Sequence, residues 1–244
     1  MEKRIILAGI PIEIHTLFDS LCHTEDYETD EPPAFSLSIS GEDLLYEQRK
    51  SMEEAAYEGL PCPAYSPAEL ESTAVYRKIA ARLPDYDALV FHGSAVAVGD
   101  KAYLFTAKSG TGKTTHTGLW LKNIEGSYVV NGDKPILRIM DGRPFVCGTP
   151  WMGKEGLGCG RNVPLAAICL LNRSADNRIE KADFGKVYLR LIGQSYRPPE
   201  GGLVAKTVKL LERIGQSVPI FELFCNMEDE AALVSFGGMS DDKI

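Results

Sequence analysis

Hydrophobic and polar residues alternate with the period of a β-strand in the first part of the chain. Residues 3–14 are rich in isoleucine and alternate in their second half, which predicts a strand with Pro11 at an edge or bulge. Residues 35–40 alternate strictly, as in a strand that buries one face. We therefore expect two strands before the first helix.

Two helices are predicted next, each with a serine at its start. Ser40 precedes a helix over residues 42–52, and Ser66 precedes a helix over residues 67–83 that begins with a proline. Together with the strands, these helices predict a small α+β region over residues 1–84. Substrate or oligomer contacts are its expected roles.

The rest of the chain, residues 85–244, alternates short apolar runs with amphipathic segments, which is typical of a mixed α/β sheet covered by helices. Gly99-Asp100 and Asp141-Gly142 are residue pairs of tight hairpin turns. The proline- and glycine-rich residues 198–202 predict a break between two helices. The expected strands cover residues 88–98, 102–106, 127–130, 135–140, 143–146, 164–171 and 218–225, and the expected helices residues 114–122, 183–194, 204–214 and 228–236.

The segment between the strand at 102–106 and the following helix predicts a phosphate-binding loop. It matches the pattern G-x-x-x-x-G-K-[ST], except that Ala107 stands at the first position. Glycines let the backbone turn so that several N–H groups point at one anion. Lys113 can reach the β- and γ-phosphates, and Thr114 can offer its hydroxyl to Mg²⁺. The residues expected to bind the nucleotide are Ser109, Gly110, Thr111, Gly112, Lys113, Thr114 and Thr115.

Two further segments carry candidate chemistry. Asp133 follows a buried-type strand and lies twenty residues after Lys113, so its carboxylate can return beside the metal of the nucleotide. An ordinary Gly-Asp turn is the alternative. Residues 148–162 form a long glycine-rich loop with Glu155 and Arg161, which favours an active-site segment over a passive linker.

Composition and charge narrow the classes of function. The 244 residues carry a formal net charge of −8, so a nucleic acid or an anionic membrane surface is not an expected partner. No apolar run reaches the length of a membrane span, and the apolar N-terminal segment lacks a signal-peptide cleavage site. The six cysteines include no C-x-x-C pair, which argues against a zinc site and favours reduced thiols in a cytoplasmic protein.

Three motifs, in this order and at close spacing, resemble those of one protein family. They are His92-Gly93-Ser94-Ala95, the loop Lys108 to Thr115, and the strand end Val129 to Asp133. With them, residues 88–171 resemble the C-terminal kinase domain of HPr kinase/phosphorylase and, more distantly, the nucleotide-binding half of ATP-dependent phosphoenolpyruvate carboxykinase. The resemblance implies a P-loop core of that type, whereas the first third does not look like the N-terminal domain of HPr kinase.

The resemblance also implies roles for individual residues. In the carboxykinases, residues that match His92 and Asp133 bind the catalytic metal, so these two and Thr114 are the expected ligands of Mg²⁺, with Mn²⁺ as an alternative. Both families have an acidic residue immediately before this aspartate, whereas this chain has Gly132. In HPr kinase that carboxylate takes the proton from the attacking serine. Glu155 is the first candidate to replace it as general base, and His92 is the second.

We therefore expect an ATP-dependent kinase that phosphorylates a hydroxyl of a small molecule or peptide. Arg161 is the expected additional cation, because a planar guanidinium suits a transferring phosphoryl group. The expected catalytic residues are Lys113, Asp133, Glu155, Arg161 and His92. HPr is a less favoured substrate, and a homo-oligomer is compatible with the resemblance because HPr kinase is a hexamer.

Three alternatives remain open. A regulatory module that binds nucleotide without catalysis would explain the missing acid. A loop that holds phosphate without a nucleoside would explain the glycines and the lysine alone. Decarboxylation of oxaloacetate is the least favoured, because the substrate-binding half of the carboxykinases has no counterpart in this chain.

Overall fold

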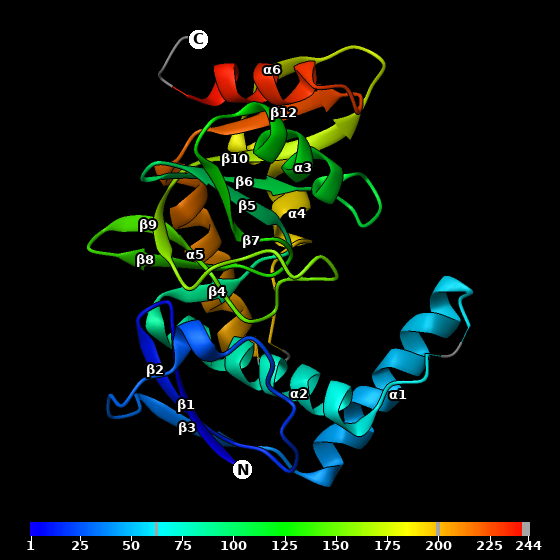
Figure 1. The fold of residues 1–244 in the computed structure, drawn as a ribbon, viewed down its shortest axis with the longest axis vertical. Helices are drawn as coiled ribbons and strands as arrows, with labels where there is room; N and C mark the ends of the chain where they lie inside the picture. Colours follow the sequence, from blue (N-terminus) through cyan, green and yellow to red (C-terminus); the bar gives the residue numbers. More distant parts are fainter. Residues whose placement is uncertain (62, 199–200, 241–244) are drawn as a thin grey trace. The chain divides into compact units, whose positions relative to one another are not determined.

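The computed structural model describes residues 1–61, 63–198 and 201–240 (Figure 1). The chain divides into two compact units, Met1–Arg82 and Leu83–Ile244. Cys62 and the middle of the expected break at residues 198–202 lie outside the described residues. No helix in the described ranges has the length and apolar character needed to cross a membrane.

The first unit contains a small three-stranded sheet and two helices within its described residues. Strand β2 pairs antiparallel with β1 and parallel with β3. The elements are β1 (Glu2–Leu7), β2 (Ile10–His15), the 3-10 turn η1 (Glu25–Tyr27), β3 (Phe35–Ser38), α1 (Gly41–Glu58) and α2 (Pro67–Arg82).

The prediction of a single strand over residues 3–14 is wrong. Ala8 and Gly9 have φ angles of 52° and 74° and form a two-residue turn, so the segment folds into the hairpin of β1 and β2. The pairing of Ile5 with Ile12 places the buried isoleucines of both strands on one face. The apolar pattern continues on both sides of the turn, and alanine is not a typical residue at positive φ. The sequence pattern therefore does not predict this turn.

Both predicted helix starts of this unit are confirmed. The Ser40 amide donates to Asp43 Oδ2 at 3.0 Å at the start of α1, and the Ser66 amide donates to Glu69 Oε2 at 2.8 Å at the start of α2. Each acid lies three residues after its serine, as in a capping box. The acids also place negative charge at the positive end of each helix.

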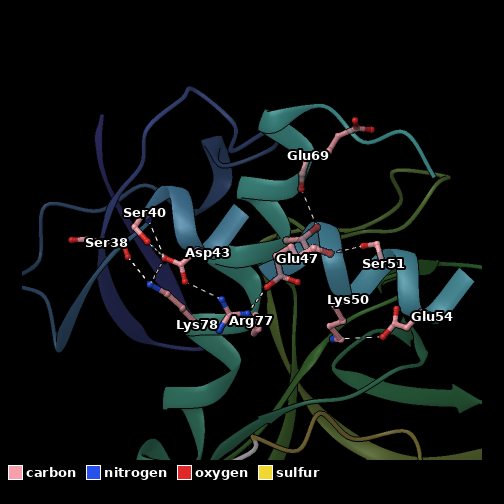
Figure 2. Close-up of polar contacts among 11 residues, drawn as sticks. Ser38, Ser40, Asp43, Glu47, Lys50, Ser51, Glu54, Glu69, Arg77 and Lys78 are labelled. Atoms are coloured by element: carbon pink, nitrogen blue, oxygen red, sulfur yellow. Dashed lines mark hydrogen bonds and ion pairs between the residues drawn. The ribbon is translucent and has the colours of Figure 1, made fainter. Parts of the chain in front are cut away.

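Ion pairs join α1 to α2 in the first unit, as Figure 2 shows. Arg77 of α2 contacts Asp43 at 3.0 Å and also pairs with the buried Glu47, and Lys78 contacts Asp43 at 2.7 Å. Although burial opposes it, hydrogen bonds from Lys78 and Ser40 lower the pKa of Asp43 to about 2. In the folded unit, the Asp43 carboxylate therefore stays charged at pH values below the ordinary pKa of an aspartate.

Replacing Asp43 by asparagine is expected to lower the free energy of unfolding of the first unit by about 2 kcal/mol at pH 7. A carboxylate with a lowered pKa stabilises the fold above its unfolded-state pKa and loses this effect as the pH falls through the folded-state value. The difference between the wild type and Asp43→Asn should therefore shrink as the pH falls from 4 toward 2. Denaturant unfolding at several pH values measures it.

The control for this prediction is Glu54→Gln. Glu54 also belongs to α1 and pairs with Lys50 at 3.7 Å, but its side chain is 66% exposed. An exposed pair of this kind contributes about 0.5 kcal/mol or less. Equal losses in the two variants would contradict the role given to Asp43.

The second unit is built around one mixed sheet, so the expected α/β fold class is confirmed. Its strands follow the order β4-β8-β9-β10-β6-β5-β7, with β12 also paired to β10 and β11 paired to β12. The strands are β4 (Ala88–Val90), β5 (Ser94–Val98), β6 (Lys101–Thr106), β7 (Ser127–Asn131), β8 (Ile136–Met140), β9 (Arg143–Cys147), β10 (Asn162–Arg173), β11 (Arg178–Lys181) and β12 (Ile220–Cys225). The helices are the 3-10 turn η2 (Leu83–Tyr86), α3 (Lys113–Asn123), α4 (Phe184–Ile192), α5 (Gly201–Ser217) and α6 (Glu230–Met239).

Helices cover both faces of this sheet (Figure 1). Phe105 of β6 belongs to the cluster that contains Trp120 of α3 and Ala232 of α6, while the preceding Leu104 packs with Leu191 of α4 and with residues of α5. Successive side chains of a strand point to opposite faces, so a continuous apolar run fits a strand buried on both sides.

The predicted strand over residues 88–98 is wrong in its middle, whereas both predicted hairpins are confirmed. β4 pairs with β8, and β5 pairs with β6 across the turn at Gly99-Asp100. Between β4 and β5 the chain therefore crosses from the side of β8 to the side of β6, and His92 and Gly93 lie in this crossing. A Cβ at Gly93 would lie 2.9 Å from the carbonyl oxygen of Phe105, so this crossing needs glycine.

Four strand ends share one edge of the sheet. β6 is parallel to β10, β10 is parallel to β12, and β7 runs in the same direction as β6 because both are antiparallel to β5. The carboxyl ends of parallel strands are a usual place for ligands. The residues at or just after these ends are Thr106, Asn131, Arg173 and Cys225.

Candidate functional site

The glycine-rich segment after β6 forms an open turn that leads into α3. Gly110 and Gly112 have φ angles of 76° and 124°, which side chains with a Cβ rarely adopt. Gly112 is the N-cap residue of α3, and no side chain caps this end of the helix. The amides of the first helical turn are therefore available to an anion, which the helix dipole also favours.

Lys113 is held against the loop that it follows. Its Nζ donates to the carbonyl oxygen of Ala107 at 3.1 Å, so the alanine at the first pattern position contributes through its backbone. Burial lowers the pKa of Lys113, and the negative charge of Asp133 opposes this effect. Lys113 therefore lies within electrostatic reach of Asp133.

His92 lies beside the same aspartate. Its Nε2 is 3.5 Å from Asp133 Oδ1, and the Gly93 amide donates to the carbonyl oxygen of Asp133 at 3.0 Å. Nδ1 lies 2.9 Å from Oε1 of Gln194. In the tautomer in which Nδ1 donates to this oxygen, the neutral ring has the lone pair of Nε2 on the side of Asp133. Burial lowers the pKa of His92, and the charge of Lys113 lowers it further, which favours a neutral imidazole at pH 7.

The oxygen and nitrogen ligands beside Lys113 fit a divalent cation that also binds phosphate oxygens. Asp133 offers a carboxylate and His92 an unprotonated Nε2, both about one-third exposed, and Thr114 lies exposed in the first turn of α3. Across the described ranges, no three His, Cys, Asp or Glu side chains form a cluster that could enclose a metal. Mg²⁺ commonly binds through one or two protein ligands plus substrate phosphates, and imidazole also suits Mn²⁺.

Asn131 fixes the backbone around Asp133 although the sequence did not single it out. Its side chain is fully buried, and Oδ1 accepts from the Asp133 amide at 2.9 Å and from the Lys134 amide at 2.7 Å. Its Nδ2 donates to the carbonyl oxygen of Thr149 at 3.1 Å. Asn131 therefore joins the end of β7 to the start of the long loop.

The long loop, residues 148–162, packs closely over Gly132. The Gly132 amide donates to the carbonyl oxygen of Leu157 at 2.9 Å. A Cβ at Gly132 would lie 2.8 Å from the carbonyl oxygen of Met152 and 3.2 Å from that of Leu157. An acidic side chain at this position would therefore require the loop to move.

Glu155 and Arg161, the other predicted site residues of this loop, form no hydrogen bond or ion pair with His92, Lys113 or Asp133. Glu155 is exposed and has no hydrogen-bond or ion-pair partner among the described residues. The guanidinium of Arg161 lies over the ring of Tyr128, 5.2 Å from its centre, near the opposite end of β7 from Asp133. The structure thus brings three of the five predicted catalytic residues together.

The structure places a different arginine at the glycine-rich loop of Lys108 to Thr115, which the sequence predicts to bind phosphate and which we call the phosphate loop. Arg173, the last residue of β10, donates through Nε to the carbonyl oxygen of Thr111 at 3.2 Å and through Nη2 to that of Gly110. It follows, after Asn172, the apolar run over residues 164–171 that the sequence predicts as a strand. The sequence does not reveal the order of strands in the sheet. Arg173 could therefore not be placed, because only the parallel pairing of β10 with β6 brings it beside the loop.

Two hollows border the phosphate loop, and Arg173 lines both of them. The large hollow has a volume of about 1010 Å³ and the small hollow one of about 430 Å³. Residues that define the large hollow include Lys108, Gly110, Leu189, Arg190 and Gln194. Residues that define the small hollow include Thr115, His116, Leu119, Asn226 and Met227.

Comparisons with known proteins give a distant similarity in structure and none in sequence. No protein-family model matches the sequence, and no curated protein matches it. Among solved structures, the Hpr(Ser) kinase/phosphatase from Coxiella burnetii is similar over 59% of this chain and 90% of its own chain, with 8% sequence identity and a TM-score of 0.32.

Proposed function

We propose that this protein is an ATP-dependent phosphotransferase that transfers a phosphoryl group to a hydroxyl of a small molecule or peptide. The observation that carries the proposal is the grouping of Lys113, His92 and Asp133 beside an open, glycine-rich helix start. A lysine and two metal-binding side chains next to exposed backbone amides are what the phosphates of a nucleotide require.

Each residue of the group has a distinct part in this proposal. The loop amides hold the phosphates, and Lys113 leaves the carbonyl of Ala107 to contact the β- and γ-phosphates. Asp133, His92 and Thr114 would hold Mg²⁺, which supplies charge neutralisation when it is bound. Positioning and charge stabilisation account for most of the catalysis of phosphoryl transfer, so an acid at Gly132 is not essential to the proposal.

The proposal is tested by incubating the protein with Mg²⁺, γ-labelled ATP and a panel of hydroxyl compounds and peptides. We expect label transfer and ADP formation that depend on one class of acceptor and stop when EDTA removes the metal. Absence of Mg·ADP binding in calorimetry would contradict the proposal.

A second candidate is a regulatory module that binds nucleotide without turnover. The crowded position of Gly132 favours it, because no acidic side chain can occupy the place of the expected general base in this conformation. Binding of Mg·ATP without label transfer to any acceptor in the panel would support this candidate over the kinase.

A further inference from the structure

We infer that the small hollow binds the nucleoside part of the nucleotide, which leaves the large hollow to the phosphate acceptor. This inference rests on the proposed function and adds the direction in which the nucleotide lies across the phosphate loop. Three observations carry it: the position of the catalytic group, the chemistry of the small hollow, and the two basic side chains that line the large hollow alone.

The group of His92, Lys113 and Asp133 marks the end of the loop where the γ-phosphate belongs. The large hollow lies at this end, because Gln194, which lines it, is the hydrogen-bond partner of His92. Both hollows touch the loop at Gly110 and Thr111, but the small hollow alone continues along Gly112, Thr115 and His116 at the start of α3. A chain of phosphates that starts at Lys113 therefore leads its nucleoside toward the small hollow.

The chemistry of the small hollow suits a base and a ribose. Leu119, Leu171 and Met227 provide apolar walls, and the volume of about 430 Å³ lies in the usual range for small-molecule sites. His116 lines it as well, with 2% of its surface exposed. Its Nδ1 is buried and has no hydrogen-bond partner among the described residues, so the fold itself does not use this polar atom.

The large hollow has a different character. Lys108 and Arg190 line the large hollow and do not line the small hollow, whereas Arg173 lines both. In-line transfer requires the acceptor to approach the γ-phosphate from the side opposite the leaving group, so the acceptor and the nucleoside must lie on opposite sides of the reacting phosphate. The hollow beside His92 meets this requirement.

Two exposed apolar residues offer a matched test. Met227 lines the small hollow and is 76% exposed, while Leu189 lines the large hollow and is 79% exposed. Both can be replaced by aspartate without loss of a core contact. Calorimetric titration of the wild type, Met227→Asp and Leu189→Asp with Mg·ADP and with pyrophosphate separates contacts to the nucleoside from contacts to the phosphates.

We expect the wild type to prefer ADP over pyrophosphate. Met227→Asp should weaken ADP binding about tenfold and pyrophosphate binding less than about twofold, whereas Leu189→Asp should leave the ratio of the two affinities unchanged. The reverse pattern, or equal affinities of the wild type for ADP and pyrophosphate, would overturn the inference. Absence of binding of both compounds to the wild type would instead refute the proposed function.

Discussion

Replacing Lys113 by alanine should lower the rate of phosphoryl transfer by at least about 10³-fold, because a fixed cation at the transferring phosphoryl group stabilises the charge of the transition state. Lys113 is the loop residue whose ammonium lies within reach of Asp133 and His92. Its hydrogen bond to Ala107 keeps it at the loop before the nucleotide arrives. Initial rates of ADP formation with a saturating acceptor measure the effect.

Lys122→Ala is the control for this experiment. Lys122 lies on the same helix, but it is exposed and pairs with Asp229 at 2.6 Å, away from the phosphate loop. Its replacement should change the rate less than about twofold, since an exposed ion pair contributes little. A Lys113→Ala variant that keeps more than a tenth of the wild-type rate would exclude this lysine from catalysis.

Local spacing predicts the phosphate loop, because all its parts lie within one short segment. The glycines with positive φ, the start of α3 at Lys113 and the preceding strand are properties of neighbouring residues. The same holds for the helix starts at Ser40 and Ser66, where each cap lies three residues from its partner. Interactions of this range can be inferred from sequence without knowing the fold.

Local spacing does not predict which residues from distant segments of the chain lie at the candidate site. Arg161 has the chemistry of an additional cation, but the long loop brings it to Tyr128. Arg173 reaches the phosphate loop only because β10 lies beside β6, and that pairing depends on the order of strands in the sheet. The turn at Ala8 and Gly9 escaped prediction for another reason, since its alanine adopts an unfavourable φ that the flanking pairing maintains.

The crowding at Gly132 gives a structural reason for the absence of an acidic side chain at this position. From the sequence alone, Gly132 stands where the families that the chain resembles have an acid, which leaves the general base to another residue. In the structure the long loop occupies the space, with the carbonyl oxygens of Met152 and Leu157 facing the α-carbon. The Gly132 amide also donates to Leu157, so this glycine anchors the loop.

Gly132→Asp is therefore expected to destabilise the second unit by about 3 kcal/mol or more, because overpacking against fixed backbone forces the surroundings to shift. It should also expose residues 148–162 to proteolysis, and it should not raise the rate of label transfer. Thermal unfolding, limited proteolysis and the transfer assay measure the three effects. Gly118→Asp on α3 is the control, since a Cβ there meets no atom within 4 Å and the substitution adds the same charge. A stable Gly132→Asp variant with faster transfer would show instead that the loop yields easily and that the acid alone is missing.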